Sequence, residues 1–241
     1  MSELEIRADG GGDALVPLVV AQRIQLRFTK GAAIRFISHL DLLRTFERAM
    51  RRAKLPLAFS QGFNPRPRFS IYIPLPVGAT SEAELANIDL AERLPLGEVT
   101  QRLNAVLPPS IRVLDEEEIP FEGPHASSQI DTAEYLVEAV AGEDVDPAIV
   151  QSIIEEFLNA EHWPYLRSSD KKGSREVDLR QPVLALEFVE AEGTMVRLRM
   201  EINIGGEGGA RPREVIAALS TKIPGLEDRR VHRSKLYNRS I

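Results

Sequence analysis

The order of predicted strands and helices, which occurs twice along the chain, constrains the fold more than any other feature of the sequence. Alternating apolar and polar residues indicate strands, and apolar residues at helical spacing indicate amphipathic helices. The first series comprises strands at residues 20–28, 69–73, 85–91 and 111–114 and helices at residues 38–54 and 96–107. In chain order this series is strand, helix, strand, strand, helix, strand.

The second series has the same order with one additional strand. It comprises strands at residues 135–140, 177–179, 184–189, 194–202 and 230–237 and helices that begin at Pro147 and Pro212. A β-α-β-β-α-β unit is typical of the ferredoxin-like fold. The sequence therefore predicts an α+β protein with two tandem ferredoxin-like (βαββαβ) domains.

A linker is predicted between the two series. The acidic run at residues 115–118 is followed by Pro120, Gly123 and a Ser-Ser pair, a composition typical of linkers. We place the N-terminal domain at residues 21–119, the linker at 120–129 and the C-terminal domain at 130–241. Residues 1–20 have acidic residues before a short apolar patch, which predicts a disordered lead-in rather than a signal peptide.

The composition excludes several kinds of site. The chain has no cysteine, which excludes disulfides, thiolate zinc sites and cysteine-ligated iron–sulfur clusters. Its four histidines lack the spacing of a metal-binding motif, and no apolar run approaches the roughly 18 residues of a membrane span. We therefore expect a cytoplasmic protein with no metal, no cofactor in this chain and no membrane segment.

The net charge of −6 conceals a separation of charge along the chain. Residues 30–68 contain nine basic and two acidic residues, whereas residues 82–122 contain three basic and ten acidic residues. The chain from residue 229 to its end adds five basic residues and no acidic one. A protein whose charge is separated in this way can bind a polyanion on one face.

The basic segment combines a helix with a stiff loop. The helix predicted at residues 38–54 presents four arginines beside or opposite its apolar stripe. The loop after it, SQGFNPRPRFS at residues 60–70, adds two arginines, an aromatic ring and amides on a proline-rich frame. Guanidinium groups bind phosphates, aromatic rings stack on unpaired bases, and amides read base edges. The predicted RNA-binding residues are Arg44, Arg48, Arg51, Arg52, Gln61, Phe63, Asn64, Arg66 and Arg68, with Arg233 of the last strand as an extension.

The alternative interpretation of this segment is a solvated helix face followed by a loop whose phenylalanines plug the core. Catalysis rests on a single candidate, His39, which could act as a general acid or base at the start of the helix. Ser38, His39 and Asp41 do not form a hydrolase triad, because neighbours on one helical turn point in different directions. The glycine-rich stretch at residues 205–212 lacks the features of a phosphate-binding loop and favours a flexible connection.

Two stretches resemble the radical-SAM-associated protein family. These are IRFISHLDLLRTFERAMRRAKLP at residues 34–56 and SQGFNPRPRFSIYIPLPVG at residues 60–78. The resemblance implies a radical SAM protein as the partner, either as a separate chain or fused to this domain. A more distant likeness, at the level of the fold, is to CRISPR repeat-processing endoribonucleases.

These observations lead to three functional hypotheses. The first is an RNA-binding accessory module, not itself an enzyme, that presents structured RNA, tRNA or rRNA, to a partner radical SAM modifying enzyme. The second is a metal-independent endoribonuclease that uses His39. The third is a protein-interaction domain of a radical SAM protein with no role in RNA binding.

Overall fold

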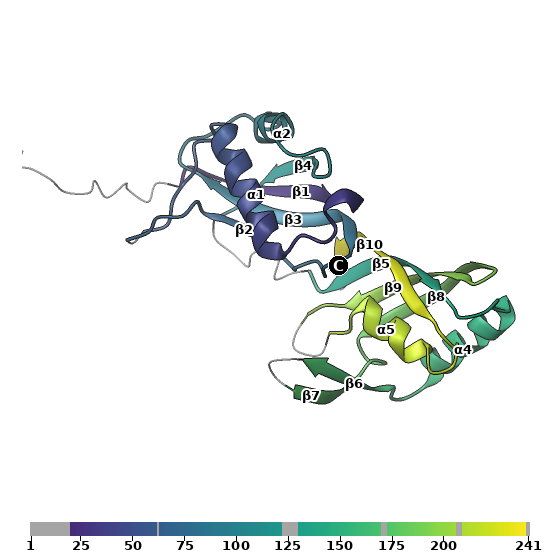
Figure 1. Ribbon diagram of the computed structural model, residues 1–241. Helices are drawn as coiled ribbons and strands as arrows, with labels where there is room; N and C mark the ends of the chain where they lie inside the picture. The colour runs from purple at the N-terminus through teal and green to yellow at the C-terminus, as the bar shows by residue number, and fades with distance from the viewer. Residues whose placement is uncertain (1–19, 62, 122–129, 170–172, 206–208, 240–241) are drawn as a thin grey trace, which may run out of the picture.

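A computed structural model describes residues 20–61, 63–121, 130–169, 173–205 and 209–239. These residues form a mixed α/β fold with one large, mostly antiparallel sheet, a separate two-stranded sheet and four α-helices in the described ranges (Figure 1). Residues 1–19 of the predicted lead-in and residues 122–129 of the predicted linker lie outside the described residues.

The first half of the chain forms one end of the large sheet. Its elements are β1 (Gln22–Lys30), the 3-10 helix η1 (Ala32–Ile34), α1 (His39–Arg52), β2 (Phe69–Ile71), β3 (Thr80–Leu90), α2 (Glu98–Asn104) and β4 (Val113–Glu118). The strand order is β4-β1-β3, with β2 beside β3, and every one of these pairs is antiparallel. The predicted helices and strands of this half are confirmed, with shifted boundaries.

The second half forms the other end of the large sheet. Its elements are β5 (Thr132–Val140), α4 (Pro147–Asn159), β6 (Pro164–Ser169), β7 (Gly173–Asp178), β8 (Val183–Glu192), β9 (Met195–Asn203), α5 (Pro212–Leu219) and β10 (Glu227–Tyr237). The strand order is β10-β5-β9-β8, again antiparallel throughout. The strand predicted at 177–179 belongs instead to a separate hairpin, whose first strand, β6, the sequence did not predict.

Each half has its own hydrophobic core. In the first half Phe46 of α1 packs against Phe28, with ring centroids 4.8 Å apart, and against Phe69 at 5.2 Å. In the second half Phe157 of α4 packs against Trp163 at 5.0 Å. The alternation that predicted the strands therefore places their apolar side chains under the helices.

The acidic run at residues 115–118 belongs to strand β4 and not to a linker. Glu116 accepts hydrogen bonds from the backbone amides of Gly97 and Thr100, next to the start of α2. Glu118 accepts one from Gln22 at 3.0 Å and pairs with Arg93 at 2.7 Å. Because β4 is an edge strand, its charged side chains also discourage pairing with a strand of another molecule.

A parallel strand pair joins the two halves into one sheet. β3 lies beside β10, with Thr80 opposite His232 and Ser81 opposite Arg233. At this seam the Arg233 side chain is fully buried and donates to Glu84 from Nε at 3.0 Å and from Nη2 at 2.5 Å. Nη2 of Arg233 also donates to the carbonyl of Ile73 at 2.9 Å.

The ion pair at the seam has a buried cation beside it. Lys30, only 2% exposed, donates from Nζ to the carbonyls of Arg35 at 3.1 Å and Ile37 at 3.4 Å. Burial lowers the pKa of Lys30, and the Glu84 carboxylate opposes that shift. Oε2 of Glu84 accepts no hydrogen bond from any described residue, so the two bonds from Arg233 to Oε1 are the hydrogen bonds that hold this carboxylate.

We predict that Arg233→Met lowers the free energy of unfolding by about 3 to 5 kcal/mol, because it leaves the buried Glu84 carboxylate without its guanidinium partner. Urea unfolding measures the loss. Lys235→Met, on the same strand but largely exposed, is the control. The double variant Glu84→Gln/Arg233→Met should recover part of the loss. A loss in Arg233→Met no larger than in Lys235→Met would show that the ion pair does not stabilise the seam.

Candidate functional site

Helix α1 presents its arginines to solvent as predicted. The helix begins after Ser38, whose Oγ accepts a hydrogen bond from the Asp41 amide at 3.1 Å. Its buried face consists of Leu42, Phe46, Ala49 and Met50. Arg44, Arg48, Arg51 and Arg52 are all exposed. The helical periodicity alone therefore accounts for this arginine face.

The arginines of this face have only weak partners. Arg44 pairs with Asp41 at 3.3 Å, and Arg51 lies 4.0 Å from Glu47. Arg48 donates to Thr45 Oγ1 at 3.2 Å. Exposed pairs of this kind contribute roughly 0 to 1 kcal/mol, so the guanidinium groups remain available to an anionic ligand.

The described residues of the loop at residues 60–68, which are 60–61 and 63–68, extend away from the sheet between α1 and β2 (Figure 1). Its base is closed by hydrogen bonds between Ser60 and Arg66: the Ser60 amide donates to the Arg66 carbonyl at 2.8 Å, and the Arg66 amide donates to Ser60 Oγ at 3.1 Å. Phe63 at the tip is fully exposed, and Gln61, Asn64 and Arg66 are exposed as well. The interpretation that both phenylalanines plug the core is thus wrong for Phe63 and right for Phe69, which packs on α1.

Arg68 anchors this loop to the sheet. Its Nε donates to Asp89 of β3 at 2.7 Å, and the same carboxylate accepts from Arg23 of β1 at 2.6 and 2.9 Å. Burial alone would raise the pKa of Asp89, but the hydrogen bonds from Arg23 and Arg68 outweigh it and hold the pKa below its ordinary value. Arg68 is therefore partly committed to the fold.

Arg233, the proposed extension of the RNA-binding surface, requires a correction. Its side chain is buried in the ion pair with Glu84 at the seam and cannot contact an external ligand. The alternation of β10 explains the error, because Val231 and Arg233 face the helix-covered side of the sheet, where the two halves meet. Arg233 was predicted to be exposed because it is charged, and the sequence did not show that its strand lies in the middle of the sheet.

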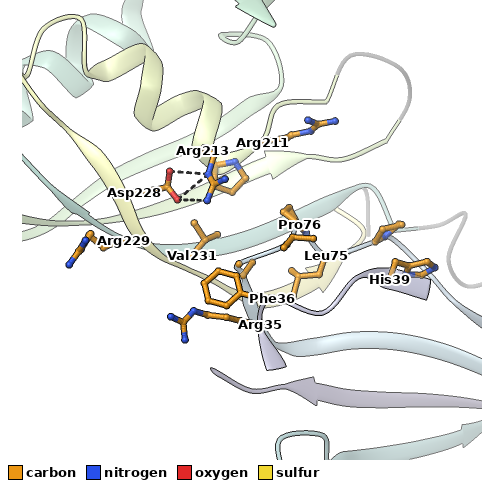
Figure 2. Close-up of a pocket in the computed structure, with 15 residues that line it drawn as sticks. Arg35, Phe36, His39, Leu75, Pro76, Arg211, Arg213, Asp228, Arg229 and Val231 are labelled. Atoms are coloured by element: carbon orange, nitrogen blue, oxygen red, sulfur yellow. Dashed lines mark hydrogen bonds and ion pairs between the residues drawn. The ribbon is translucent and has the colours of Figure 1, made fainter. Parts of the chain in front are cut away.

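A pocket of about 680 Å³ lies where the two halves meet (Figure 2). We call it the junction pocket. The segments that line it come from both halves: residues 35–39 and 74–79 from the first, and residues 211–213 and 228–231 from the second. The side chains that give it its chemistry are Arg35, Phe36, His39, Arg211, Arg213 and Arg229.

The junction pocket has a positive balance of charge. Its single acidic residue among those described, Asp228, pairs with Arg213 through two guanidinium nitrogens at 3.0 and 3.1 Å. The guanidinium of Arg35 lies over the ring of Phe36, 4.4 Å from its centroid. Among the described residues no carboxylate lies within ion-pair distance of Arg35 or Arg229, and Arg211 lies 3.9 Å from Glu214, which Arg167 already binds. The Phe36 ring beside them is 68% exposed. Such a pocket is suited to an anion that has a flat, apolar part.

A buried ion pair positions the arginines at the start of α5. Arg167 of β6 donates to both oxygens of Glu214 at 2.6 Å and to the carbonyl of Gly209 at 2.8 Å. Glu214 in turn accepts from the amide of Arg211 at 3.0 Å. Because these bonds fix the first turn of α5, Arg211 and Arg213 have a defined backbone position beside the pocket.

The sequence did not single out the residues of the junction pocket other than His39. Arg35 and Phe36 lie between η1 and α1, and Arg211 directly precedes the helix that was predicted to begin at Pro212. His39 is half-buried at the pocket and forms no hydrogen bond with a described residue. Ser38 and Asp41 bond to each other at 2.8 Å, so they do not orient the His39 ring.

In the described ranges, His, Asp and Glu side chains do not gather in groups of three that could hold a metal ion. No helix among the described residues is both long enough and apolar enough to cross a membrane.

We predict that Asp89→Asn lowers the free energy of unfolding at pH 7 by about 3 kcal/mol, because Arg23 remains buried without a countercharge. The pKa of Asp89 is depressed in the folded state, so its contribution is present above the unfolded pKa and is lost as the pH falls through the folded pKa. Urea unfolding at pH 7 and at about pH 3 should therefore show a gap between wild type and variant that shrinks in acid. A gap of equal size at both pH values would contradict this assignment.

The fold resembles that of a chain in a solved complex at very low sequence identity. A chain in the crystal structure of a Cbf5-Nop10-Gar1 complex has a TM-score of 0.51 and 12% identity, over 93% of this chain and 51% of that one. A chain of the archaeal box H/ACA sRNP Nop10-Cbf5 complex has a TM-score of 0.49 and 11% identity, over 90% and 49%. This chain spans about half the length of those structures, and the likeness to the first concerns the fold alone.

No curated protein matches this sequence. A family model does: the model described as "Uncharacterized protein conserved in bacteria (DUF2344)" matches residues 23–212. The match includes α1, the loop at residues 60–68 and the sheet up to the start of α5. Because it covers well over half of the chain, this protein belongs to the bacterial DUF2344 family.

Proposed function

We propose that this protein is an RNA-binding module. The observation on which the proposal rests is the arrangement of exposed arginines and exposed aromatic rings along the first half of the fold. The junction pocket lies beside the Thr80 end of β3, and the base of the loop at residues 60–68 is anchored at Asp89. Thr80 and Asp89 are nine positions apart along β3, which corresponds to a distance of about 30 Å between the pocket and the base of the loop. α1 and its arginines begin at the pocket.

A polyanion fits this arrangement better than a small anion does. Guanidinium groups spread over about 30 Å match the spaced phosphates of a nucleic-acid backbone. The junction pocket and the loop at residues 60–68 each add an aromatic ring on which an unpaired base can stack. In this proposal Arg44, Arg48, Arg51, Arg52 and Arg66 contact phosphates. Phe63, Asn64 and Gln61 at the loop tip contact exposed bases, as structured RNA with loops and bulges offers.

We also infer that each half is a ferredoxin-like unit. The support is the strand order, which is the same in both halves: the last strand pairs with the first, the first with the third, and the third with the second. In the second half the hairpin β6–β7 is an insertion into that pattern. The two units would then form one RNA-binding surface because β3 and β10 join them.

The resemblance to radical-SAM-associated proteins supplies the partner in this proposal. The module would present structured RNA, tRNA or rRNA, to a radical SAM modifying enzyme. A chain without cysteine cannot ligate the radical SAM cluster in the usual way, so that chemistry would belong to the partner. A cytoplasmic location stays a prediction of the same kind.

The position of His39 favours a second candidate function, a metal-independent endoribonuclease. Its ring lines the junction pocket, where three arginines could hold a phosphate of the substrate. Cleavage of RNA that persists in EDTA and disappears in His39→Ala would establish this function. RNA binding without cleavage would leave the binding module as the better account.

We predict that wild-type protein binds total small RNA with an affinity that falls steeply between roughly 50 and 300 mM salt. Arg44→Ala/Arg48→Ala/Arg51→Ala should weaken binding at every salt concentration and reduce the slope of log K against log[salt] by about 2 to 3, one for each lost phosphate contact. Fluorescence anisotropy or filter binding measures both quantities.

The matched control removes the same charge from the opposite face of the sheet. Arg197, Arg199 and Arg230 each pair with a glutamate there, at 3.6, 3.5 and 3.5 Å. Their replacement by alanine should leave RNA affinity within about twofold of wild type, since those arginines are already neutralised. Wild type that binds no RNA at 50 mM salt would refute the proposal and favour the protein-interaction hypothesis.

A further inference from the structure

We propose that the junction pocket takes a single unpaired nucleotide of the bound RNA, with its base on Phe36 and the phosphates on its two sides on Arg211 and Arg229. The inference rests on the proposed RNA-binding function and makes it specific. It assigns the pocket, rather than the loop at residues 60–68, as the place where a base leaves the solvent.

The backbone on both sides of Phe36 is held in place, so the exposed ring can serve as a platform for a base. The carbonyls on both sides of it, those of Arg35 and Ile37, accept hydrogen bonds from the buried Nζ of Lys30. The Arg35 carbonyl also accepts from the Gly78 amide at 2.8 Å. Three hydrogen bonds thus fix the backbone around a ring that is 68% exposed. A large aromatic side chain held outside a core in this way is suited to contact with a ligand.

The platform is prepared for a base on one side. The Arg35 guanidinium covers one face of the ring, 4.4 Å from the centroid, and in this proposal the base stacks on the other face. Stacking on an aromatic ring does not depend on which base is present, because every base has a π face. The guanidinium behind the ring adds positive charge to the stack.

The second half of the fold supplies the phosphate contacts across the pocket (Figure 2). Arg213 is neutralised by Asp228. Arg211 lies 3.9 Å from Glu214, but that carboxylate is already bound by the buried Arg167. No described carboxylate lies within ion-pair distance of Arg229. Arg211 and Arg229 lie on opposite sides of the pocket (Figure 2), so they offer donors to two different phosphates of the strand, one on each side of the nucleotide on Phe36.

The geometry favours an unpaired nucleotide over a duplex or an acidic peptide. A pocket of about 680 Å³ is in the range of pockets that bind small ligands, so it can hold a single nucleotide. A base within a duplex is stacked on its neighbours and has no free face for the Phe36 ring. An acidic or phosphorylated peptide would contact the arginines but would gain nothing specific from the ring.

The experiment compares wild type with Phe36→Ala, Phe36→Trp and Arg211→Ala/Arg229→Ala, using labelled total small RNA and fluorescence anisotropy. Phe36→Ala should lose about fivefold or more in affinity, the size of one lost base stack, while Phe36→Trp should keep wild-type affinity. The double arginine variant should lose affinity and about two units of salt slope. Leu96→Ala, an exposed apolar residue away from the pocket, is the control and should bind as wild type does.

Unlabelled competitors test the kind of ligand. Single-stranded oligouridylate should displace the labelled RNA from wild type at a lower concentration than from Phe36→Ala, whereas a blunt RNA duplex should displace both equally. If Phe36→Ala and Arg211→Ala/Arg229→Ala both bind RNA with wild-type affinity, the inference about the pocket is overturned, while the proposed RNA-binding function stands. Displacement by polyglutamate as effective as by oligouridylate would also overturn it, in favour of an acidic protein ligand. Wild type that binds no RNA would refute both proposals.

Discussion

The buried ion pair between Arg233 and Glu84 is the interaction on which the rest of the structure depends. It lies where β3 and β10 join the two halves, between two separate hydrophobic cores. The same guanidinium holds the carbonyl of Ile73, a β-branched residue with φ of 47°. That conformation costs roughly 1 to 3 kcal/mol and persists only when its surroundings fix it. Residues 74–79, which follow Ile73, line the junction pocket. The ion pair at the seam therefore fixes the position of this wall of the pocket.

The seam also determines the opposite wall of the pocket. Lys30, buried near Glu84, holds the backbone on both sides of Phe36, and Val231 lies two residues before Arg233 on the same face of β10. Charge buried at the seam therefore places the aromatic platform and the arginine-bearing strand at a fixed separation. The arrangement is a reason to retain buried charges that contribute little net stability, since such charges can specify one geometry among several.

Local patterns predicted the parts of the fold that depend on local periodicity. The Ser38 cap and the apolar stripe after it gave α1 and its outer arginine face, and the alternation in the strands gave most of the sheet. The hairpin strand β6 was missed because its sequence, PYLRSS, does not alternate between apolar and polar residues: Leu166 is exposed and Arg167 is half-buried. The seam and the pocket were missed for a different reason. The seam pairs residues 80 and 232, and the pocket draws on four segments, so neither has a signal in any one stretch of sequence.

The separation of charge in the sequence has a clear outcome in three dimensions. The basic segment forms α1 and the loop after it, whereas the acidic run forms the edge strand β4, where Glu116 and Glu118 are occupied by contacts within the fold. A protein with a net charge of −6 can thus offer a polyanion a positive surface and repel it from the sheet edge. The electrostatic field of such a protein orients the RNA as the two molecules meet, and it also raises the rate of association.

The central claim is that both halves of the fold contact RNA together at the junction pocket. Amide hydrogen exchange with and without bound small RNA tests it most directly. We expect slower exchange at residues 35–40 and, in the same complex, at residues 213–214 and 229–231 of the other half, with no change at the amides of β9. Protection confined to one half, or found in β9, would contradict the proposal.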